Sequence, residues 1–289
     1  MRTLLYSLLV AMLCAGATSA ATFDLEVPLL GGDHAASFRL WFSEDSEKIA
    51  SVIVLTPGTN GDGRGWVNDT EWQRLARETG AALLACSLRG ENGGSYCEPQ
   101  RWSGEILLHA LETLGAQGRH PELAAAPLTL WGHSAGGQFN FNFACWRPDR
   151  VVAFVVNKGA YYTGAPSDAT RQIPALFIAG EVDESIRVEN ITSLYARHRR
   201  LGAPWCLAVE PGAGHEVGRT KELGIAFLRP ILISRQNNTP LAAPWRGDLT
   251  THEVSVADGA TPAGAITAWL PDKPSADAWR AFVHHERMP

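Results

Sequence analysis

The sequence has no long run of lysine or arginine, and its densest basic stretch is the short segment at residues 198–200. Its 289 residues include 25 Lys and Arg against 30 Asp and Glu, which gives a formal net charge of −5. Because a nucleic-acid-binding protein needs a concentrated basic surface, this distribution predicts no nucleic-acid partner. The sequence also has no internal repeat and no low-complexity segment, so nothing indicates a repeat architecture.

No segment after the first twenty residues is long and apolar enough to span a bilayer. The first twenty residues have the features of a secretory signal peptide, because Arg2 provides a positive charge and residues 4–17 are mostly apolar. Small residues precede a cleavage point after Ala20 or Ala21. We therefore predict that residues 1–20 are a signal peptide and that the mature chain is secreted or periplasmic, with no stable membrane anchor.

The five cysteines show none of the paired spacings of a zinc site, and the sequence implies no metal and no organic cofactor. Cys14 lies in the predicted signal peptide, which leaves Cys86, Cys97, Cys145 and Cys206. An even number of cysteines in an oxidising compartment predicts disulfides. Three pairings are possible, and a bridge between Cys86 and Cys97 across one loop is the simplest. The alternative is that Cys86 and Cys145, which lie in apolar stretches, are buried free thiols.

Predicted strands and helices alternate between residues 51 and 228. This alternation is typical of an α/β fold with a mainly parallel sheet that is flanked by helices on both faces. Two further strands, at residues 22–29 and 36–42, precede this region, and a Gly-Gly-Asp turn joins them. We expect them to form an antiparallel hairpin at the N-terminal edge of the sheet. Together these elements define a predicted main domain over residues 21–235.

A polar, proline-containing break separates this domain from a C-terminal extension, residues 236–289. We expect the last helix of the main domain to cover residues 222–228 and to end before Pro230, because proline removes a helical hydrogen bond. The extension is small for an independent domain, so we expect it to pack on the main domain. Its predicted helix begins with Ser275 as the N-cap. The predicted elements of the extension are strands at residues 253–256 and 265–270 and a helix at residues 275–283.

The segment GHSAGG, residues 132–137, directly follows a predicted buried strand at residues 128–131. A serine in a Gly-x-Ser-x-Gly segment between a strand and a helix sits on a tight, strained turn that lifts its hydroxyl above the edge of the sheet. Small residues are needed on both sides of the serine because larger side chains would collide there. The turn also directs the first amides of the following helix to the same point, where they stabilise a developing oxyanion. We therefore predict that Ser134 is a nucleophile.

The helix after Ser134 is predicted against a local pattern. Residues 139–143 alternate Phe and Asn, a period of two that is typical of a strand. However, Phe139 and Phe143 also recur at helical spacing, and the turn requires a helix after the serine. We predict a helix within residues 134–146. We expect His133 to shape the site rather than to act as a base.

A serine hydroxyl is a weak nucleophile, so it needs a base and an acid that orients the base. Asp183 follows the predicted strand at residues 173–179, and His215 lies in a glycine-rich loop after the strand at residues 205–209. The order Ser, Asp, His is that of a known class of serine hydrolases. All three residues follow the carboxyl ends of strands, where parallel sheets place their sites. The alternatives left open are Glu181 or Glu184 as the acid, and His215 as a surface loop residue.

The oxyanion hole needs a second amide besides that of Ala135. The predicted strand at residues 51–56 leads into a glycine-rich loop, where the amide of Thr59 or Asn60 is the candidate. The following segment, GDGRG at residues 61–65, lacks the Gly-Lys-Ser/Thr ending of a phosphate-binding loop, so no nucleotide is expected.

Four stretches of the sequence, in this order, resemble the α/β-hydrolase superfamily: VIVLTPG, GHSAGG, IAGEVDES and GAGHEVG. Within it the chain is most similar to secreted bacterial esterases related to polyhydroxybutyrate depolymerases and to feruloyl or acetylxylan esterases. The resemblance covers about residues 50–230, implies the α/β-hydrolase fold, and matches Ser134, Asp183 and His215 to the triad positions. The chain departs in one place, because TPG stands before the oxyanion loop where many relatives have His-Gly.

Residues 157–172 are all that separate the strand after the nucleophile helix from the strand that bears the acid, so no large lid fits there. An open site suits a bulky, polysaccharide-linked or polymeric ester as the partner. Trp66, Tyr161 and Tyr162 are candidates for lining the cleft, with ordinary packing as the alternative. The predicted function is a serine carboxylic ester hydrolase that works through an acyl-enzyme. The alternatives are a serine peptidase or amidase on the same scaffold, and a non-catalytic binding protein.

Overall fold

The computed structural model describes residues 20–27, 35–90, 95–257 and 266–288. The predicted signal peptide therefore lies outside the described residues, except for Ala20, which is the first residue of strand β1 (Ala20–Val27). Strand β1 pairs antiparallel with β2 (Ala35–Ser43) along its whole length. The predicted N-terminal hairpin is thus confirmed, while its turn falls outside the described residues.

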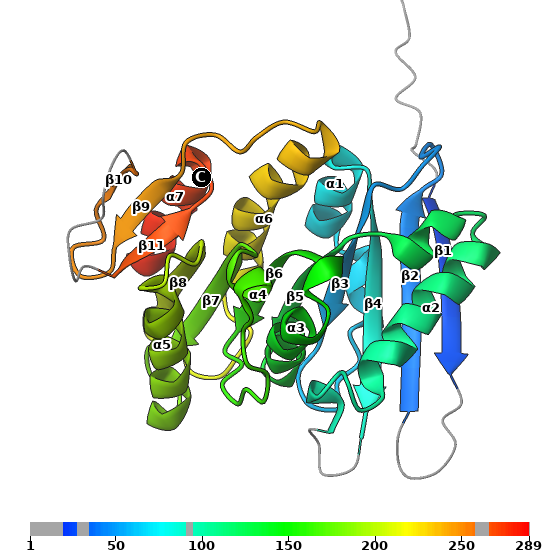
Figure 1. Ribbon diagram of the computed structural model, residues 1–289, viewed down its shortest axis with the longest axis horizontal. Coiled ribbons are helices and arrows are strands. Elements are labelled where there is room, and N and C mark those ends of the chain that lie inside the picture. The colour runs from blue at the N-terminus through cyan, green and yellow to red at the C-terminus, as the bar shows by residue number, and fades with distance from the viewer. Residues whose placement is uncertain (1–19, 28–34, 91–94, 258–265, 289) are drawn as a thin grey trace, which may run out of the picture.

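Within the described ranges, eight strands form one sheet in the order β1-β2-β4-β3-β5-β6-β7-β8 (Figure 1). Strands β3 to β8 run parallel to one another, and β2 joins them antiparallel to β4. The predicted α/β class, with a mainly parallel sheet and an antiparallel edge, is confirmed. The parallel strands are β3 (Ser51–Thr56), β4 (Ala81–Arg89), β5 (Leu128–His133), β6 (Val151–Asn157), β7 (Ala175–Gly180) and β8 (Trp205–Glu210).

Helices cover both faces of the sheet (Figure 1). On one face lie α2 (Ser103–Gln117), α3 (Ala135–Trp146) and α5 (Ser185–Arg199), and on the other lie α1 (Thr70–Glu78), α6 (Thr220–Gln236) and α7 (Lys273–Val283). Strand β3 shows why both layers are needed, because all six of its residues are buried and its apolar side chains alternate between the two cores. The short helices are α4 (Asp168–Arg171), η1 (Arg64–Asn68), η3 (Ser95–Cys97), η4 (Pro121–Ala125) and η5 (Pro148–Arg150).

Helix α3 forms over the Phe-Asn alternation, as predicted. Its residues from Ala135 to Ala144 are all buried, so this helix has no solvent face whose polar residues would mark a helical period. The two asparagines are satisfied inside the protein: the amide of Asn140 donates to the Val155 carbonyl, and that of Asn142 donates to the Cys97 carbonyl. The alternation therefore reflects buried polar contacts rather than a strand.

The C-terminal extension forms a second, three-stranded antiparallel sheet in the order β10-β9-β11, beside α7. Its strands are β9 (Trp245–Asp248), β10 (Val254–Val256) and β11 (Thr267–Leu270), of which β9 was not predicted. The indole of Trp279 in α7 is completely buried and donates to the Leu207 carbonyl of β8 at 2.7 Å. The hydroxyl of Tyr195 donates to the Thr267 carbonyl at 2.9 Å. These contacts place the extension against the β8 end of the main sheet.

Two predictions about helix ends are wrong, and Ser275 is involved in both. Helix α6 continues through Pro230 to Gln236 instead of ending before the proline. Pro230 has no N–H to donate to the carbonyl four residues earlier, that of Ala226, but the hydroxyl of Ser275 donates to this oxygen at 2.9 Å. Ser275 is accordingly not an N-cap, because α7 begins earlier and Asp272 caps it by accepting from the Ser275 amide.

Candidate active site

The backbone at Ser134 is strained. This residue has φ 53° and ψ −118°, between the end of β5 and the start of α3. A Cβ atom added to Gly136 would lie 2.2 Å from the Thr56 carbonyl oxygen, and one added to Gly132 would lie 2.5 Å from the backbone of Gly136. Only glycine fits at either position, so the strand, the helix and the end of β3 approach closely enough to form the predicted turn.

The structure brings together the three residues singled out as nucleophile, base and acid. The hydroxyl oxygen of Ser134 lies 2.8 Å from Nε2 of His215, and Nδ1 of His215 lies 2.8 Å from Oδ2 of Asp183. A carboxylate only accepts hydrogen bonds, so Nδ1 carries the proton and Nε2 is free to accept from the serine hydroxyl. The side chain of Asp183 is 2% exposed and that of His215 is 35% exposed. A buried acid therefore orients a histidine that reaches solvent beside the serine.

The two alternative acids make other contacts. Glu181 accepts from the Gly212 amide at 2.7 Å, and the exposed Glu184 forms an ion pair with Nε of Arg187 at 3.0 Å. The second oxygen of Asp183 accepts from the Glu184 amide at 2.8 Å, which fixes the rotation of the Asp183 carboxylate. Of the three carboxylates, Asp183 is the one hydrogen-bonded to His215.

His133 precedes the serine in the chain, and its side chain contacts the histidine loop. Its Nε2 donates to the carbonyl oxygen of His215 at 2.8 Å, and burial lowers the pKa of its imidazole below the ordinary value. Its other nitrogen, Nδ1, lies near Gly58, where an added Cβ would be 3.3 Å away. His133 therefore holds the loop of His215 against the turn, in agreement with a role in shaping the site.

The amides expected to bind an oxyanion have no partner among the described residues: no hydrogen bond is formed by the amide nitrogen of Ala135, Thr59 or Asn60. Ala135 is the first residue of α3, so its amide lies at the positive end of the helix. Thr59 and Asn60 are exposed on the turn after β3. The preceding residue, Gly58, is so close to the serine that a Cβ atom added to it would lie 3.5 Å from the Cβ atom of Ser134. The loop thus lies directly beside the serine.

The disulfide expectation is contradicted. Cys86, Cys97, Cys145 and Cys206, all within the described residues, are free. Although Cys86 and Cys97 flank one loop, their side chains go to different places: the thiol of Cys86 faces the Leu55 carbonyl, and that of Cys97 faces the Ala135 carbonyl at 3.3 Å. Burial raises the pKa of the Cys86 thiol to about 12 and that of the Cys97 thiol to about 12. The alternative named Cys86 and Cys145 as buried free thiols; both are free, and Cys86 is buried while Cys145 is half-buried.

The three aromatic residues proposed to line a cleft are placed differently from one another. Tyr161 is 48% exposed, and the guanidinium of Arg187 lies 5.1 Å from its ring centre. Tyr162 packs its ring 4.6 Å from that of Phe141 in the core and donates its hydroxyl to the Gly159 carbonyl. Trp66 packs edge-on against Trp131 at 5.4 Å. Tyr161 is therefore the one of the three that is mainly exposed, while Tyr162 and Trp66 are largely packing residues.

A buried ion pair behind the histidine loop was missed from the sequence. Lys158 directly follows β6 and Glu210 ends β8; their side chains are 0% and 4% exposed, and Nζ lies 2.8 Å from Oε2. The one available signal was a lysine at the carboxyl end of an apolar strand, in the sequence VVAFVVNK. Charges are rarely buried so completely unless they are paired and bonded further.

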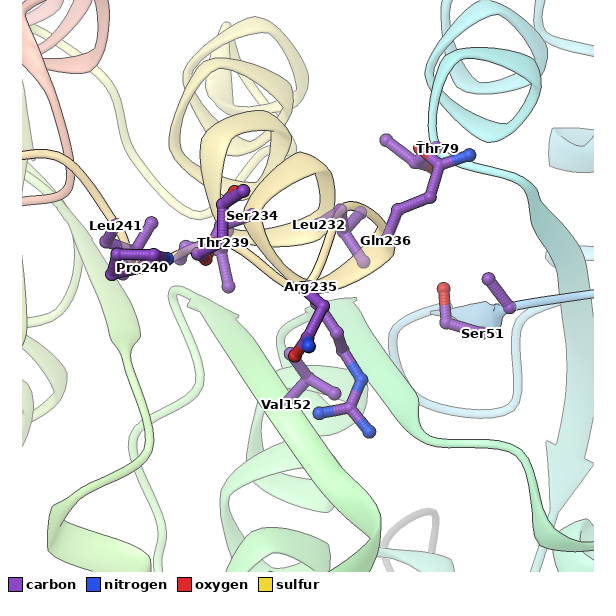
Figure 2. Close-up of a pocket in the computed structure, with 13 residues that line it drawn as sticks. Ser51, Thr79, Val152, Leu232, Ser234, Arg235, Gln236, Thr239, Pro240 and Leu241 are labelled. Atoms are coloured by element: carbon purple, nitrogen blue, oxygen red, sulfur yellow. The ribbon is translucent and has the colours of Figure 1, made fainter.

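A pocket of about 720 Å³ lies away from these residues (Figure 2). Ser51 and Val152, near the starts of β3 and β6, line it together with Arg235 at the end of α6. Ser134 and Asp183 follow the carboxyl ends of β5 and β7, whereas this pocket lies at the amino ends of the parallel strands.

In the part of the chain that the structure describes, no group of three or more His, Cys, Asp or Glu is placed to hold a metal ion. No helix in the same ranges is both long and apolar enough to cross a membrane.

No protein-family model matches the chain, and no curated protein matches its sequence. Solved structures do match it. A ferulic acid esterase aligns with TM-score 0.58 at 12% identity, over 74% of this chain and 98% of that protein. An S-formylglutathione hydrolase from Staphylococcus aureus aligns with TM-score 0.55 at 12% identity, over 74% and 97%. A poly(aspartic acid) hydrolase from Sphingomonas sp. KT-1 aligns with TM-score 0.52 at 16% identity, over 70% and 97%. At these identities the likeness shows the fold, and it confirms the fold that the sequence predicts.

Proposed function

We propose that this chain, which has the α/β-hydrolase fold, is a serine carboxylic ester hydrolase. One observation carries the proposal: an unbroken series of hydrogen bonds runs from the Ser134 hydroxyl through both nitrogens of His215 to the Asp183 carboxylate. A base that touches the nucleophile, and an acid that fixes the tautomer of the base, are the requirements of this chemistry.

In the proposed reaction the Ser134 oxygen attacks the ester carbonyl while Nε2 of His215 takes the hydroxyl proton. The oxyanion that forms is stabilised by the amide of Ala135 and by that of Thr59 or Asn60. His215 then gives the proton to the leaving alcohol, which departs and leaves an acyl-serine. Water, deprotonated by His215, attacks the acyl-serine, and the proton returns to Ser134 as the acid is released. Asp183 stays ionised and stabilises the imidazolium formed in each half of the cycle.

We propose that the substrate is a bulky, polysaccharide-linked or polymeric ester. The segment between β6 and β7 carries one described helix, α4, of four residues, so it supplies no large lid. Three apolar side chains of this region are exposed: Val182 by 66% and Ile186 by 48%, on either side of Asp183 in the chain, and Tyr161 by 48%, whose ring lies against Arg187. Exposed apolar surface next to a reactive group favours a substrate with an apolar portion that covers it. The ferulic acid esterase among the structural neighbours is named for an ester of an aromatic acid, which fits such a surface.

We further propose that residues 1–20 direct export, so that the enzyme acts outside the cytoplasm, as the sequence of that segment predicts. An amide hydrolase on the same scaffold is the second candidate, because the same three residues also cleave amides. The name of one structural neighbour, poly(aspartic acid) hydrolase, refers to an amide polymer.

The test uses a chain that begins at Ala21 and the p-nitrophenyl esters of acetate, butyrate and octanoate, with a p-nitroanilide as the amide. We expect ester turnover that falls by about 10⁴- to 10⁶-fold in Ser134→Ala. Ser193→Ala, at an exposed serine of α5, is the matched control and should keep full turnover. A folded wild-type chain that cleaves the anilide but no ester would favour the amidase. Full ester turnover in Ser134→Ala would refute the assignment of the nucleophile.

A further inference from the structure

The Lys158–Glu210 ion pair is in contact with the loop that carries His215. Besides its bond to Glu210, Nζ of Lys158 donates to the Glu216 carbonyl oxygen at 2.6 Å. The other oxygen of Glu210 accepts from the Arg219 amide at 2.7 Å. The pair therefore binds the backbone one residue after His215 and again three residues further on.

Two neighbouring side chains bind the same loop. His133 donates to the carbonyl of His215, and the amide of Asn157 donates to the Val217 carbonyl at 3.2 Å and to the Thr220 hydroxyl at 2.7 Å. With the ion pair, side chains at the carboxyl ends of β5, β6 and β8 hydrogen-bond to the backbone of His215, Glu216, Val217 and Arg219. The polar groups of this short segment are thus held by the carboxyl ends of three strands.

The loop needs such anchors because its own sequence does not fix it. Gly212 and Gly218 both have positive φ, at 66° and 64°, and glycine-rich segments have much conformational freedom. At Gly218 the backbone closes over the Glu210 carboxylate, where an added Cβ would lie 2.2 Å from Oε2. Burying two charges is not favourable for stability compared with apolar side chains of the same size. A role in holding the loop in place would explain why the chain keeps a buried ion pair here.

We infer that Lys158 and Glu210 are positioning residues that hold His215 in line between Ser134 and Asp183. This inference rests on the proposed function. Proton transfer depends steeply on the separation of the two atoms, and a displacement of about 1 Å reduces the rate by up to about 100-fold. Loss of the anchor should therefore slow the chemical step and leave substrate binding largely unchanged.

The deciding variant is the double substitution Lys158→Met with Glu210→Gln. It removes both buried charges, and the introduced glutamine still accepts from the Arg219 amide, whereas the introduced methionine cannot donate to Glu216. We expect this variant to fold with a melting temperature near that of the wild type, to lose about 10- to 100-fold in kcat, and to keep its KM within about threefold. The single variant Lys158→Met leaves an unpaired carboxylate in the interior and should be far less stable. The control is Lys221→Met, which removes a half-buried lysine whose ammonium pairs with Asp69 and Glu71 in and before α1 rather than with the backbone of residues 215–219.

Hydrogen–deuterium exchange over residues 212–220 gives a readout that needs no turnover. We expect faster exchange there in the double variant and unchanged exchange in Lys221→Met. A double variant with wild-type kcat and wild-type exchange would overturn the inference. If the wild-type chain hydrolysed no substrate, the proposed function would fail, and the exchange data would still decide whether the pair anchors the loop.

Discussion

The imidazole of His133 and the backbone of His215 are joined by a hydrogen bond of 2.8 Å, so the residue before the proposed nucleophile is tied to the proposed base. A carbonyl only accepts, which requires that Nε2 of His133 carries its proton. Burial lowers the pKa of His133, and the neutral imidazole is therefore the form that makes this bond at neutral pH. The imidazole of His133 therefore fixes the distance between the turn at Ser134 and the loop that carries His215.

Removal of this ring should affect turnover more than folding. We expect His133→Phe to lower kcat by about tenfold, because the His215 loop loses a contact that fixes its height above Ser134. His133→Gln keeps an N–H donor of similar reach and should lose less activity. Steady-state kinetics on p-nitrophenyl butyrate measure both. Equal losses in the two variants would show that the donated hydrogen bond is not what matters.

Mild acid should destabilise the folded chain. Burial lowers the pKa of His133 and of His198 below the ordinary 6.5, and the charges of Arg171 and Arg197 lower that of His198 further. As the pH falls below about 6.5, the unfolded chain binds protons at these groups while the folded chain does not, so the free energy of unfolding decreases. Urea denaturation between about pH 7.5 and about pH 5.5 measures the slope. We expect a smaller slope in His198→Gln, and an unchanged slope would contradict a neutral buried His198.

The turn at Ser134 should tolerate no Cβ atom at Gly136, which packs against the end of β3. We expect Gly136→Ala to lower the free energy of unfolding by at least ~2 kcal/mol, because the added methyl would overlap the Thr56 carbonyl. Gly65→Ala is the matched control, since an added Cβ there meets nothing within 4 Å, and it should change stability by less than ~0.5 kcal/mol. Urea titration of both variants checks the pair. Equal stabilities would mean that the turn relaxes to accept the methyl group.

The thiols should be unreactive in the folded chain. Burial raises the pKa of Cys86, Cys97 and Cys145 to about 12 and that of Cys206 well above the ordinary value, so almost no thiolate forms at about pH 8. In a chain that begins at Ala21, we expect a thiol reagent to modify all four cysteines after denaturation without reductant, and almost none before it. Only two reactive thiols in the denatured chain would restore the predicted disulfide.

Much of the fold could be predicted from the sequence, because the apolar residues of the strands mark the segments that are buried in the sheet. Strand β3 is apolar throughout its centre since helices cover both of its faces, and each parallel strand could be located in the same way. The order of Ser134, Asp183 and His215 relative to these strands placed all three at one edge of the sheet, and the structure brings them within hydrogen-bonding distance. Their catalytic roles stay a prediction.

What could not be predicted depends on contacts between distant segments. Pro230 marks a helix end by its local chemistry, yet the Ser275 hydroxyl, far along the chain, supplies the hydrogen bond that proline omits. Lys158 looks like an ordinary lysine after a strand until β8 places Glu210 opposite its ammonium group. Two thiols near in sequence, at residues 86 and 97, stay free because each faces a different backbone carbonyl, that of Leu55 and that of Ala135. In each case the deciding partner lies in another part of the fold.

The extension on β8 has a consequence for association between chains. β8 is the last strand of its sheet, and a terminal strand offers unpaired amides and carbonyls to any other extended chain. Trp279 donates its indole N–H to one of those carbonyls, that of Leu207, and α7 and β11 lie beside the strand (Figure 1). In a chain cut after Gln236, β8 would be an exposed edge strand. We expect such a chain to aggregate edge to edge rather than only to lose stability.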